Sequence, residues 1–496
     1  MEFDKDLQSI QEVRNLVAKA KQAQKEYSQY TQQQVDDIVK AVARACEGQC
    51  ERLAKLACEE TGFGVWQDKV LKNRLGSTVT YESIKDLKTV GVLSEDSATG
   101  VTEIGVPMGV VAALIPSTNP TSTVMYKCLI SLKAGNAIVI SPHPGAKNCI
   151  LETFRVIGQA AKAAGAPDGI VQCVTVPSAE GTQALLKHPD IGIILATGGE
   201  AMVRAAYSSG NPALGVGPGN GPAYIEKSAD IPTAVRRIFD SKTFDNGTIC
   251  ASEQSIVTER CIADRVEAEV KRQGGYFLTD EESKKVGAFI MRANGTMNPK
   301  IVGKTAAAIA DMAGINIPQG TRVLISRQST VGKDNPYSRE KLCPILAFYV
   351  EDSWESACHR CIEILNNEGR GHTMVIHSQD KSVIREFSLK KPVSRLLVNT
   401  PGALGGVGAT TGLQPALTLG CGAVGGSSTS DNVGPLNLIN IRRVAWGCKE
   451  LSDLRGTDAA ECNASDCCSE QKSATTLTRA DIEAIARTVI AQMTNR

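Results

Sequence analysis

The sequence predicts an α/β protein with two domains, and two observations indicate this fold class. The first is a series of short apolar runs, bounded by Gly and Pro, that are typical of buried strands and alternate with helical segments. The runs are residues 109–117, 136–142, 170–177 and 191–199, and the helical segments are residues 147–165 and 199–209. The second is a similar alternation that begins near residue 222 and continues to about residue 435. Such βαβ units form parallel sheets, whose ligand crevice lies at the carboxyl ends of the strands.

The composition is that of a globular protein that binds small molecules or proteins. The 496 residues exceed what one hydrophobic core can organise, and 42% of them are hydrophobic. The formal net charge of +1 gives no electrostatic reason to expect nucleic acid or an anionic membrane as a partner. The sequence shows neither a signal peptide nor an apolar run of about 18 residues, so we expect a cytoplasmic protein.

The 16 cysteines are scattered through the predicted helices and strands, which is typical of reduced thiols in a reducing compartment. Only Cys462, Cys467 and Cys468, in the segment ECNASDCC, cluster closely enough to suggest a metal site. This segment is polar and has no histidine nearby, so we expect no metal there.

The chain is predicted to divide into two domains and an oligomer contact. Residues 1–88, which begin with amphipathic helices, form the first domain together with residues 107–220, and residues 221–435 form the second. Residues 89–106 alternate around a central SATG turn, as in a β-hairpin, and residues 436–447 supply a strand to pair with it. Hairpins that leave the body of a domain commonly serve oligomer contacts, so we expect a homodimer or homotetramer.

Beyond residue 447 the composition changes to that of a linker followed by a helix. Residues 448–476 are small and polar, and residues 477–496 carry a capping-box-like pair, Thr478 and Asp481, ahead of an apolar helical stripe. The stripe contains Ile482, Ile485, Ala486, Val489, Ile490 and Met493. A helix docked on its own domain would not need a linker of roughly 25 residues, so a helix that binds a groove on another protein is favoured.

Residues that can carry chemistry occur in several short motifs. IPSTNPTS places Asn119 after a strand, and ATGGEAMV places a Gly-Gly turn before a helix. FDNGTICASE contains Cys250, and REKLCPILAFYV contains Glu340 ahead of a proline and a strand. A cysteine taken alone is most often a small core residue, so Cys250 gains meaning only from the other motifs. In this order and at these separations the motifs resemble the aldehyde dehydrogenase superfamily, from about residue 10 to residue 447.

The resemblance implies an aldehyde dehydrogenase-like fold, with a Rossmann-type NAD-binding domain, an α/β catalytic domain and a small β oligomerisation hairpin. It also implies covalent catalysis, in which the Cys250 thiolate attacks an aldehyde, a hydride leaves to a nicotinamide ring and a thioester remains. By resemblance, the side-chain amide of Asn119 and the backbone N–H of Cys250 stabilise the oxyanion. Glu340 corresponds to a glutamate that hydrogen-bonds the nicotinamide ribose, and Thr197 and Gly198 lie by the nicotinamide and the pyrophosphate.

One departure from the family pattern indicates what removes the acyl group. Hydrolytic members have a glutamate about 35 residues before the cysteine that activates water, but here the stretch ALGVGPGNGPAY has Gly215 at that place. Without a general base water is a poor nucleophile, whereas a thiol is already a few per cent thiolate at neutral pH. The segments GVGPGNGP, SPHPGAK and TLGCGAVGGSSTSDNVGP also resemble the CoA-acylating branch. We therefore expect coenzyme A to take the acyl group; the alternative is a hydrolytic enzyme whose base lies elsewhere.

The motifs also bear on the cofactor and on a proton acceptor. Ser141, Pro142 and His143 stand where hydrolytic relatives carry a Lys-Pro-Ser-Glu segment that grips the adenosine ribose, which implies a looser hold on the cofactor. Nothing in the motifs can bind the 2′-phosphate of NADP bidentately, so NAD is favoured. His372, in GRGHTMVIHS, is either a proton acceptor for a thiol or a structural histidine.

The tail is similar to a targeting element found in the same branch. CoA-acylating aldehyde dehydrogenases of bacterial microcompartments often carry a short amphipathic helix on a flexible linker, and residues 477–493 resemble such an encapsulation peptide. The resemblance implies an enzyme within a bacterial microcompartment, bound to a shell protein through these residues. It favours propionaldehyde as substrate, with acetaldehyde next, although one methylene discriminates only modestly. A non-catalytic shell scaffold is a third hypothesis, against which stands the presence of Asn119, Cys250 and Glu340.

Overall fold

The computed structural model describes residues 4–292 and 295–455. The predicted targeting helix at residues 477–493 and most of the predicted linker lie outside the described residues. No helix in the described part of the chain has both the length and the apolar character needed to cross a bilayer.

Contacts between residues divide the chain into two units. The larger unit comprises Met1–Ser97 and Val101–Val444 and holds both large sheets. The smaller unit comprises Ala98–Gly100 and Ala445–Arg496, in which the short helix α17 (Leu451–Arg455) is described. All residues of the candidate site described below belong to the larger unit.

The first sheet has the strand order of a doubly wound fold. Its five strands are parallel and lie in the order β5-β4-β3-β6-β7. The direction of winding reverses between β3 and β6, and open sheets of this kind bind ligands beside the carboxyl ends of the strands at that point. The strands are β3 (Val110–Ile115), β4 (Ala137–Pro142), β5 (Val171–Cys173), β6 (Ile191–Thr197) and β7 (Ala213–Val216).

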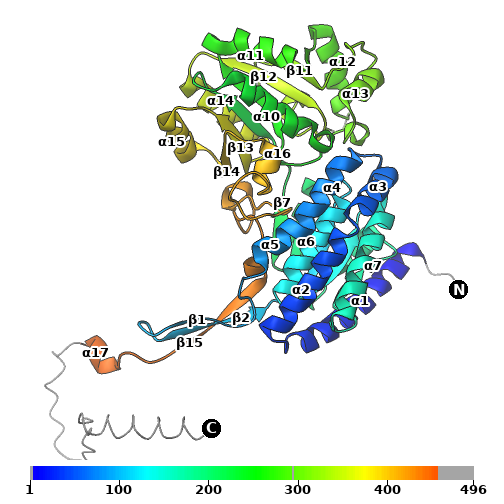
Figure 1. Cartoon of the computed structure of the whole chain (residues 1–496), viewed down its shortest axis with the longest axis vertical. Helices are drawn as coiled ribbons and strands as arrows, with labels where there is room; N and C mark the ends of the chain where they lie inside the picture. Colours follow the sequence, from blue (N-terminus) through cyan, green and yellow to red (C-terminus); the bar gives the residue numbers. More distant parts are fainter. Residues whose placement is uncertain (1–3, 293–294, 456–496) are drawn as a thin grey trace, which may run out of the picture. The chain divides into compact units, whose positions relative to one another are not determined.

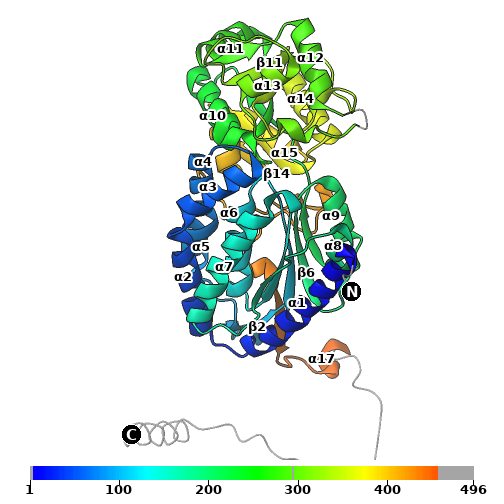
Figure 2. The same ribbon diagram turned by 90° about the vertical axis from the view of Figure 1, so that its right-hand side faces the viewer.

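Helices cover both faces of this sheet (Figure 1). Figure 2 shows α6 (Pro120–Lys133) and α7 (Lys147–Ala163) on one side, and α8 (Ala179–Leu186) and α9 (Glu200–Tyr207) on the other. Helix α1 (Lys5–Tyr27) packs against α8, and the helices that follow it pack against α6. These are α2 (Gln32–Glu47), α3 (Cys50–Thr61), α4 (Trp66–Arg74), the π-helical turn Leu75–Val79 and α5 (Thr80–Ile84). Coverage of both faces explains why the strands are continuous apolar runs in the sequence.

Helix α6 is enclosed on all sides. Every one of its residues is buried, so it shows no apolar stripe, and the sequence analysis does not predict it. The amine of Lys127 donates to the backbone carbonyls of Leu114 and Leu195, at 2.8 Å each. These two bonds link the ends of β3 and β6 and so fix the strands that frame the crevice.

The second sheet has seven parallel strands in the order β10-β11-β12-β9-β8-β13-β14. Successive residues of β8 point to opposite faces, because Tyr224 joins one hydrophobic core and its neighbours Ala223 and Ile225 join another. The predicted second α/β pattern is therefore confirmed. The strands are β8 (Gly221–Ile225), β9 (Glu253–Glu259), β10 (Gly275–Phe277), β11 (Val323–Arg327), β12 (Ile345–Glu351), β13 (Gly371–His377) and β14 (Val393–Val398).

Helices again lie on both faces of the second sheet (Figure 1). They are α10 (Ile231–Thr243), α11 (Arg260–Arg272), α12 (Asp280–Ile290), α13 (Ala306–Ala313), α14 (Trp354–Asn367), α15 (Lys381–Lys390) and α16 (Gly402–Gly406). The two large sheets are joined by the short segment that separates β7 from β8, within which the predicted domain boundary at residue 220 falls.

A third sheet has three strands in the order β1-β2-β15. The strands β1 (Gly91–Asp96) and β2 (Val101–Pro107) are antiparallel, and β15 (Ile439–Ala445) lies beside β2. Apolar side chains on β15, Ile441 and Val444, are exposed. A role for this sheet in a homodimer or homotetramer stays a prediction.

Candidate active site

The candidate site lies where the edges of the two large sheets meet. From the first sheet come residues at the carboxyl ends of strands: Asn119 follows β3, and Thr197 ends β6. From the second sheet come residues at the amino ends of strands: Cys250 precedes β9, Glu340 precedes β12 and His372 is near the start of β13. The expectation that the whole site lies at carboxyl ends is therefore wrong for the thiol, the carboxylate and the imidazole. Local sequence pattern does not show how one sheet faces another.

A cavity of about 360 Å³ collects most of the predicted residues. Its wall contains Asn119, His143, Thr197, Gly198, Cys250 and Glu340. Apolar side chains complete the wall, among them Phe63, Met297, Pro299, Val302, Leu417 and Leu419. Ser141 and Pro142 are buried at the end of β4 and are not part of the wall, and His372 lies behind Cys250. The cavity thus joins a thiol, an amide and a carboxyl group to an apolar surface that suits a short aliphatic chain.

The turn before Cys250 has a backbone conformation that few residues adopt. Asp245 and Asn246 have φ values of 48° and 50°, and Gly247 has a φ of 78°. Left-handed conformations are costly outside glycine and persist where surrounding contacts hold them. The Asp245 side chain is fully buried and bonded on several sides, and the Asn246 amide donates to the carbonyl of Gly303 at 2.9 Å. A rigid turn therefore presents the thiol.

Cys250 and His372 form a close pair. The Nε2 atom of His372 lies 3.2 Å from the Sγ atom of Cys250, and its Nδ1 atom lies 3.0 Å from the hydroxyl of Thr373. Arg395 donates to the carbonyl of His372 at 3.1 Å and to the Thr373 hydroxyl at 3.2 Å, which holds the ring in place. An Nδ1–H bonded to Thr373 leaves Nε2 free to accept the thiol proton.

Burial keeps both partners neutral in the structure. It raises the pKa of Cys250 to about 12, with a further contribution from Glu340 when that carboxyl group is ionised. It lowers the pKa of His372 to about 3, and the cation of Arg395 acts in the same direction. The resting pair is consequently a thiol beside a neutral imidazole. An imidazole in this form can accept a proton as the sulfur attacks.

Asn119 is directed at the nucleophile turn. It occupies the N-cap position of α6, but its side chain makes no capping bond to the helix. Its Nδ2 atom donates to the carbonyl of Thr248 at 3.1 Å and to the hydroxyl of Thr118 at 3.2 Å. Its Oδ1 atom accepts from the Nζ atom of Lys72 at 2.6 Å. The amide is therefore held beside the backbone that carries Cys250.

Glu340 and the glycine-rich turn form the other end of the cavity. The Oε1 atom of Glu340 accepts from the backbone N–H of Gly219 at 2.9 Å, and burial, with the charge of Glu368, raises its pKa to about 8. Thr197 and Gly198 lead into α9, whose first turn offers free N–H groups. A Cβ atom built on Gly199 or Gly217 would meet nothing within 4 Å, so the cavity is open along this backbone. Such a glycine-lined helix start suits the pyrophosphate of a dinucleotide.

The backbone at Gly215 has no room for a side chain. A Cβ atom there would lie 2.7 Å from Cγ1 of Val203 and 2.8 Å from a ring carbon of Tyr207. The N–H of Gly215 donates to the Tyr207 hydroxyl at 2.8 Å, which fixes the ring against it. The place at which hydrolytic enzymes of the resembled superfamily carry a glutamate is thus occupied by α9.

No group of three metal-ligating side chains occurs among residues 4–292 and 295–455. The cysteine cluster considered in the sequence, Cys462, Cys467 and Cys468, lies outside the described residues.

Comparison with known proteins assigns the chain to a family. The Aldehyde dehydrogenase family model matches residues 6–413. The chain belongs to the aldehyde dehydrogenase family. It is 46% identical to the bifunctional aldehyde-alcohol dehydrogenase AdhE of Escherichia coli over 442 residues, which are 88% of this chain and 50% of that protein.

It is 39% identical to the succinate-semialdehyde dehydrogenase (acetylating) of Clostridium kluyveri over 438 residues, 88% of this chain and 96% of that protein. The chain therefore spans about half the length of the aldehyde-alcohol dehydrogenases that it matches.

Solved structures of the family have the same fold. A probable aldehyde dehydrogenase of Listeria monocytogenes is 63% identical, with a TM-score of 0.90 over 91% of this chain and 100% of that one. A Rhodopseudomonas palustris propionaldehyde dehydrogenase with bound CoA and an acylated cysteine is 27% identical, with a TM-score of 0.79 over 88% and 97%. A propionaldehyde dehydrogenase from the fucose utilisation microcompartment of Clostridium phytofermentans is 28% identical, with the same TM-score and coverage. The predicted aldehyde dehydrogenase-like fold is confirmed.

Several residues that shape the site are not predicted by the sequence. Tyr207 and Thr118 leave no signal in the sequence, because Tyr207 bonds to Ser427 and Thr118 accepts from Lys69, both far along the chain. Asp245 leaves a partial signal, since the run Asp-Asn-Gly is typical of a turn with positive φ. Lys72 stands in a helix of mixed polar character, where an exposed position would be the ordinary expectation.

The pKa of Cys250 predicts how the free enzyme reacts with iodoacetamide. Because the thiol is protonated at neutral pH, the thiolate fraction should rise about tenfold per pH unit between about pH 7 and pH 9, and the alkylation rate should follow it. Peptide mass spectrometry of Cys250 measures this rate. A short cysteine peptide blocked at both ends is the control, because its rate levels off above its pKa of about 8.5. A Cys250 rate that is already constant near pH 7 would contradict the protonated resting state.

Proposed function

We propose that this chain catalyses the NAD-dependent, CoA-acylating oxidation of a short-chain aldehyde. The observation that carries the proposal is the nucleophile with its proton acceptor, because Cys250 lines the cavity and its Sγ atom lies 3.2 Å from Nε2 of His372. Gly215, at the position expected for the hydrolytic glutamate, has no room for a side chain beside Tyr207. Relatives named as acetylating and a structure with bound CoA and an acylated cysteine support the same reaction.

The first half-reaction uses residues from both sheet edges. The Sγ atom of Cys250 attacks the aldehyde carbonyl while Nε2 of His372 takes the thiol proton. The oxygen that becomes negative lies beside the backbone N–H of Cys250 and the Nδ2 atom of Asn119, where it replaces the Thr118 hydroxyl as the partner of the amide. NAD, when bound, supplies the hydride acceptor.

The cofactor is assigned to the glycine-lined end of the cavity. Thr197 and Gly198 would hold the nicotinamide and pyrophosphate region, and Glu340 would accept from the nicotinamide ribose. His143 would contact the adenosine side, where burial lowers its pKa and keeps the ring neutral. Ser141 and Pro142 would act only through the backbone that they support at the end of β4, since neither reaches the wall.

Release of the acyl group is the step at which a thiol and water compete. Among the described residues that line the cavity, Glu340 is the one carboxylic acid, and it is bonded to Gly219 beside the proposed ribose site. No carboxylate is therefore free to activate water at the thioester, whereas the thiolate of CoA is a good nucleophile without such activation. Once His372 has released the first proton to solvent, it can accept the proton of the incoming thiol and return it to the Cys250 thiolate that leaves the thioester. Acyl-CoA is thus the product, and the hydrolytic enzyme that releases free acid is the alternative.

Propionaldehyde is the favoured substrate and acetaldehyde the next. The apolar wall formed by residues such as Met297, Val302 and Leu419 accommodates an aliphatic chain without polar contacts to it. Solved relatives named as propionaldehyde dehydrogenases support the three-carbon substrate, and a further relative is named as an acetylating dehydrogenase of succinate semialdehyde.

A product assay tests this function. The full chain, incubated with NAD and acetaldehyde, propionaldehyde or butyraldehyde, should form acyl-CoA when CoA is present and little free acid when it is absent. Cys250→Ala should lose turnover by about 10⁴-fold or more, because the nucleophile is gone. Chromatography of acyl-CoA and free acid measures both. Free propionate formed at the full rate without CoA would favour the hydrolytic alternative.

We further propose that the enzyme acts inside a bacterial microcompartment and binds a shell protein through residues 477–493. The amphipathic pattern of that segment supports the proposal, as does the likeness to a dehydrogenase of a microcompartment. A homodimer or homotetramer that uses residues 89–106 and 436–447 is proposed with it.

Removal of residues 456–496 tests the targeting proposal. The shortened chain should keep the kcat of the full chain, because all residues of the site lie before this segment, but should no longer co-purify with shells. Sedimentation of shells followed by an activity assay measures both quantities. If the deletion lowers kcat as much as it lowers shell association, the segment belongs to the enzyme instead.

A further inference from the structure

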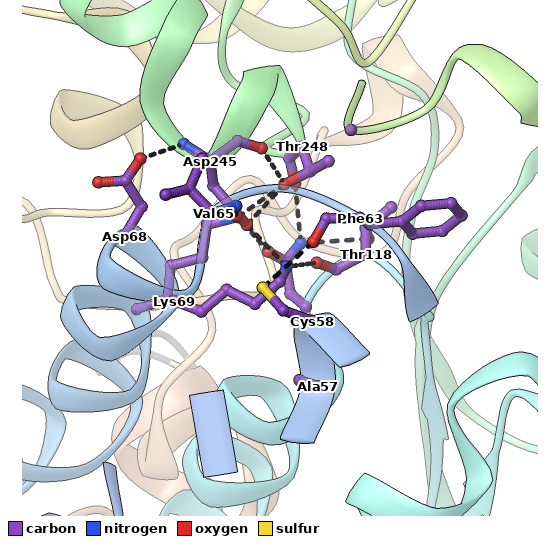
Figure 3. Close-up of polar contacts among 12 residues, drawn as sticks. Ala57, Cys58, Phe63, Val65, Asp68, Lys69, Thr118, Asp245 and Thr248 are labelled. Carbon is purple, nitrogen blue, oxygen red and sulfur yellow. Dashed lines mark hydrogen bonds and ion pairs between the residues drawn. The ribbon is translucent and has the colours of Figure 1, made fainter. Parts of the chain in front are cut away.

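A buried cluster of charges underlies the nucleophile turn, and the proposed function does not assign it a role. Figure 3 shows Lys69 and Asp68, from helix α4, beside Asp245 and Thr248 of the turn. Lys69, Lys72 and Asp245 are each no more than 2% exposed. Burying charged groups is costly unless they are paired and bonded, so a cluster of this kind needs a reason.

Asp245 is the centre of the cluster. Its Oδ2 atom accepts from Lys69 at 2.9 Å, from Lys72 at 2.5 Å and from the Thr248 hydroxyl at 2.7 Å. Its Oδ1 atom accepts from the backbone N–H of Val65 at 2.7 Å. Burial raises the pKa of this carboxyl, but the lysine charges outweigh it and the net shift is downward. Asp245 therefore remains ionised and ties the turn to α4.

Lys72 also touches the oxyanion amide, and Lys69 does not. The Nζ atom of Lys72 donates to Oδ1 of Asn119 at 2.6 Å and to the hydroxyl of Thr248 at 3.0 Å, in addition to Asp245. An ammonium group has three N–H donors, so all of them are used. The Nζ atom of Lys69 donates instead to the backbone carbonyl of Thr118 at 3.2 Å.

These contacts determine which way the Asn119 amide points. A lysine ammonium can only donate, so the atom that faces Lys72 must be the amide oxygen. The backbone carbonyl of Thr248 can only accept, so the atom 3.1 Å from it must be the amide nitrogen. With the oxygen held by Lys72, the N–H donors are directed toward the cavity side, where Thr118 and Cys250 lie. The reverse orientation would set an N–H₂ group against an ammonium.

We propose that Lys72 is a positioning residue, which holds the carboxamide of Asn119 so that its N–H groups face the oxyanion formed on Cys250. Its positive charge also polarises the amide and strengthens the N–H donors. Asp245 is the buried anion that retains Lys72 at this place. The proposal rests on the proposed function, because it deepens the role given there to Asn119.

The chain offers a matched control for this proposal. Lys69 and Lys72 come from the same helix, are equally buried and bond to the same carboxylate oxygen. Replacing either with Met removes one positive charge and one bond to Asp245. Only Lys72→Met also frees the amide of Asn119.

The experiment compares Lys72→Met and Lys69→Met by three measurements on the full chain. The first is the kcat for acyl-CoA formation, the second is the rate of Cys250 alkylation by iodoacetamide, and the third is the thermal unfolding midpoint. Alkylation forms no oxyanion, so it reports the nucleophile but not Asn119. Lys72→Met should lower kcat by about 10²-fold, since misplacing a catalytic group has this effect. Lys69→Met should lower kcat far less. The two variants should have alkylation rates similar to each other, and their unfolding midpoints should also be similar.

A double-mutant cycle with Asn119→Ala gives a second readout. If Lys72 acts through the amide, Lys72→Met should lower kcat little further once the amide is absent. Equal losses of kcat in the two lysine variants, a loss of alkylation that matches the loss of kcat, or full additivity with Asn119→Ala would each overturn the proposal. If Lys72→Met does not fold, Lys72→Gln and Lys69→Gln serve for the same comparison.

The same assays separate this proposal from the proposed function. Absence of acyl-CoA with the unaltered chain, or an unchanged kcat in Asn119→Ala, means that the function or the oxyanion role of Asn119 is wrong. A large loss in Asn119→Ala together with equal losses in the lysine variants overturns only the role of Lys72.

Discussion

The site depends on one buried carboxylate, that of Asp245. It lies in the left-handed turn before Cys250 and accepts bonds from Lys69, Lys72, Thr248 and the backbone of Val65. A Cβ atom on Gly64 would lie 1.8 Å from Oδ1 of Asp245, so the loop that contains Gly64 can pack against Asp245 only with glycine at this position. These contacts offset the strain of the turn and join helix α4 to the turn that carries Cys250.

The proposed chemistry follows from the side chains that lie at the two sheet edges and from the absence of a glutamate at Gly215. The carboxyl edge of the first sheet supplies Asn119 and the glycine turn at Thr197, and the amino edge of the second supplies Cys250, His372 and Glu340. Tyr207 packs against Gly215 and fills the direction in which a glutamate would extend. We therefore propose that a thioester formed in this cavity passes to a thiol more readily than to activated water.

Local patterns in the sequence predict the strands and the candidate catalytic residues, but not the long-range contacts that hold these residues in place. Buried parallel strands such as β3 and β6 can be predicted because their apolar runs have turn residues at both ends. Helix α6 cannot be predicted in this way, because a helix buried on all sides lacks the polar face that identifies a surface helix. The hydrogen-bonded residues Lys72 and Asp245 are 173 positions apart in the sequence, and Tyr207 and Ser427, which are also hydrogen-bonded, are 220 positions apart. Contacts between residues so far apart form only when the two sheets come together, so no short sequence motif predicts them.

The central claim is that the acyl group on Cys250 passes to a thiol rather than to water. Intact mass spectrometry of the full chain, incubated with propionaldehyde and NAD but without CoA, tests it most directly. We predict a propionyl adduct that maps to Cys250, persists while CoA is absent and disappears on addition of CoA as an equal amount of propionyl-CoA forms. An adduct that decays to free propionate without CoA, at the rate of normal turnover, would contradict the claim.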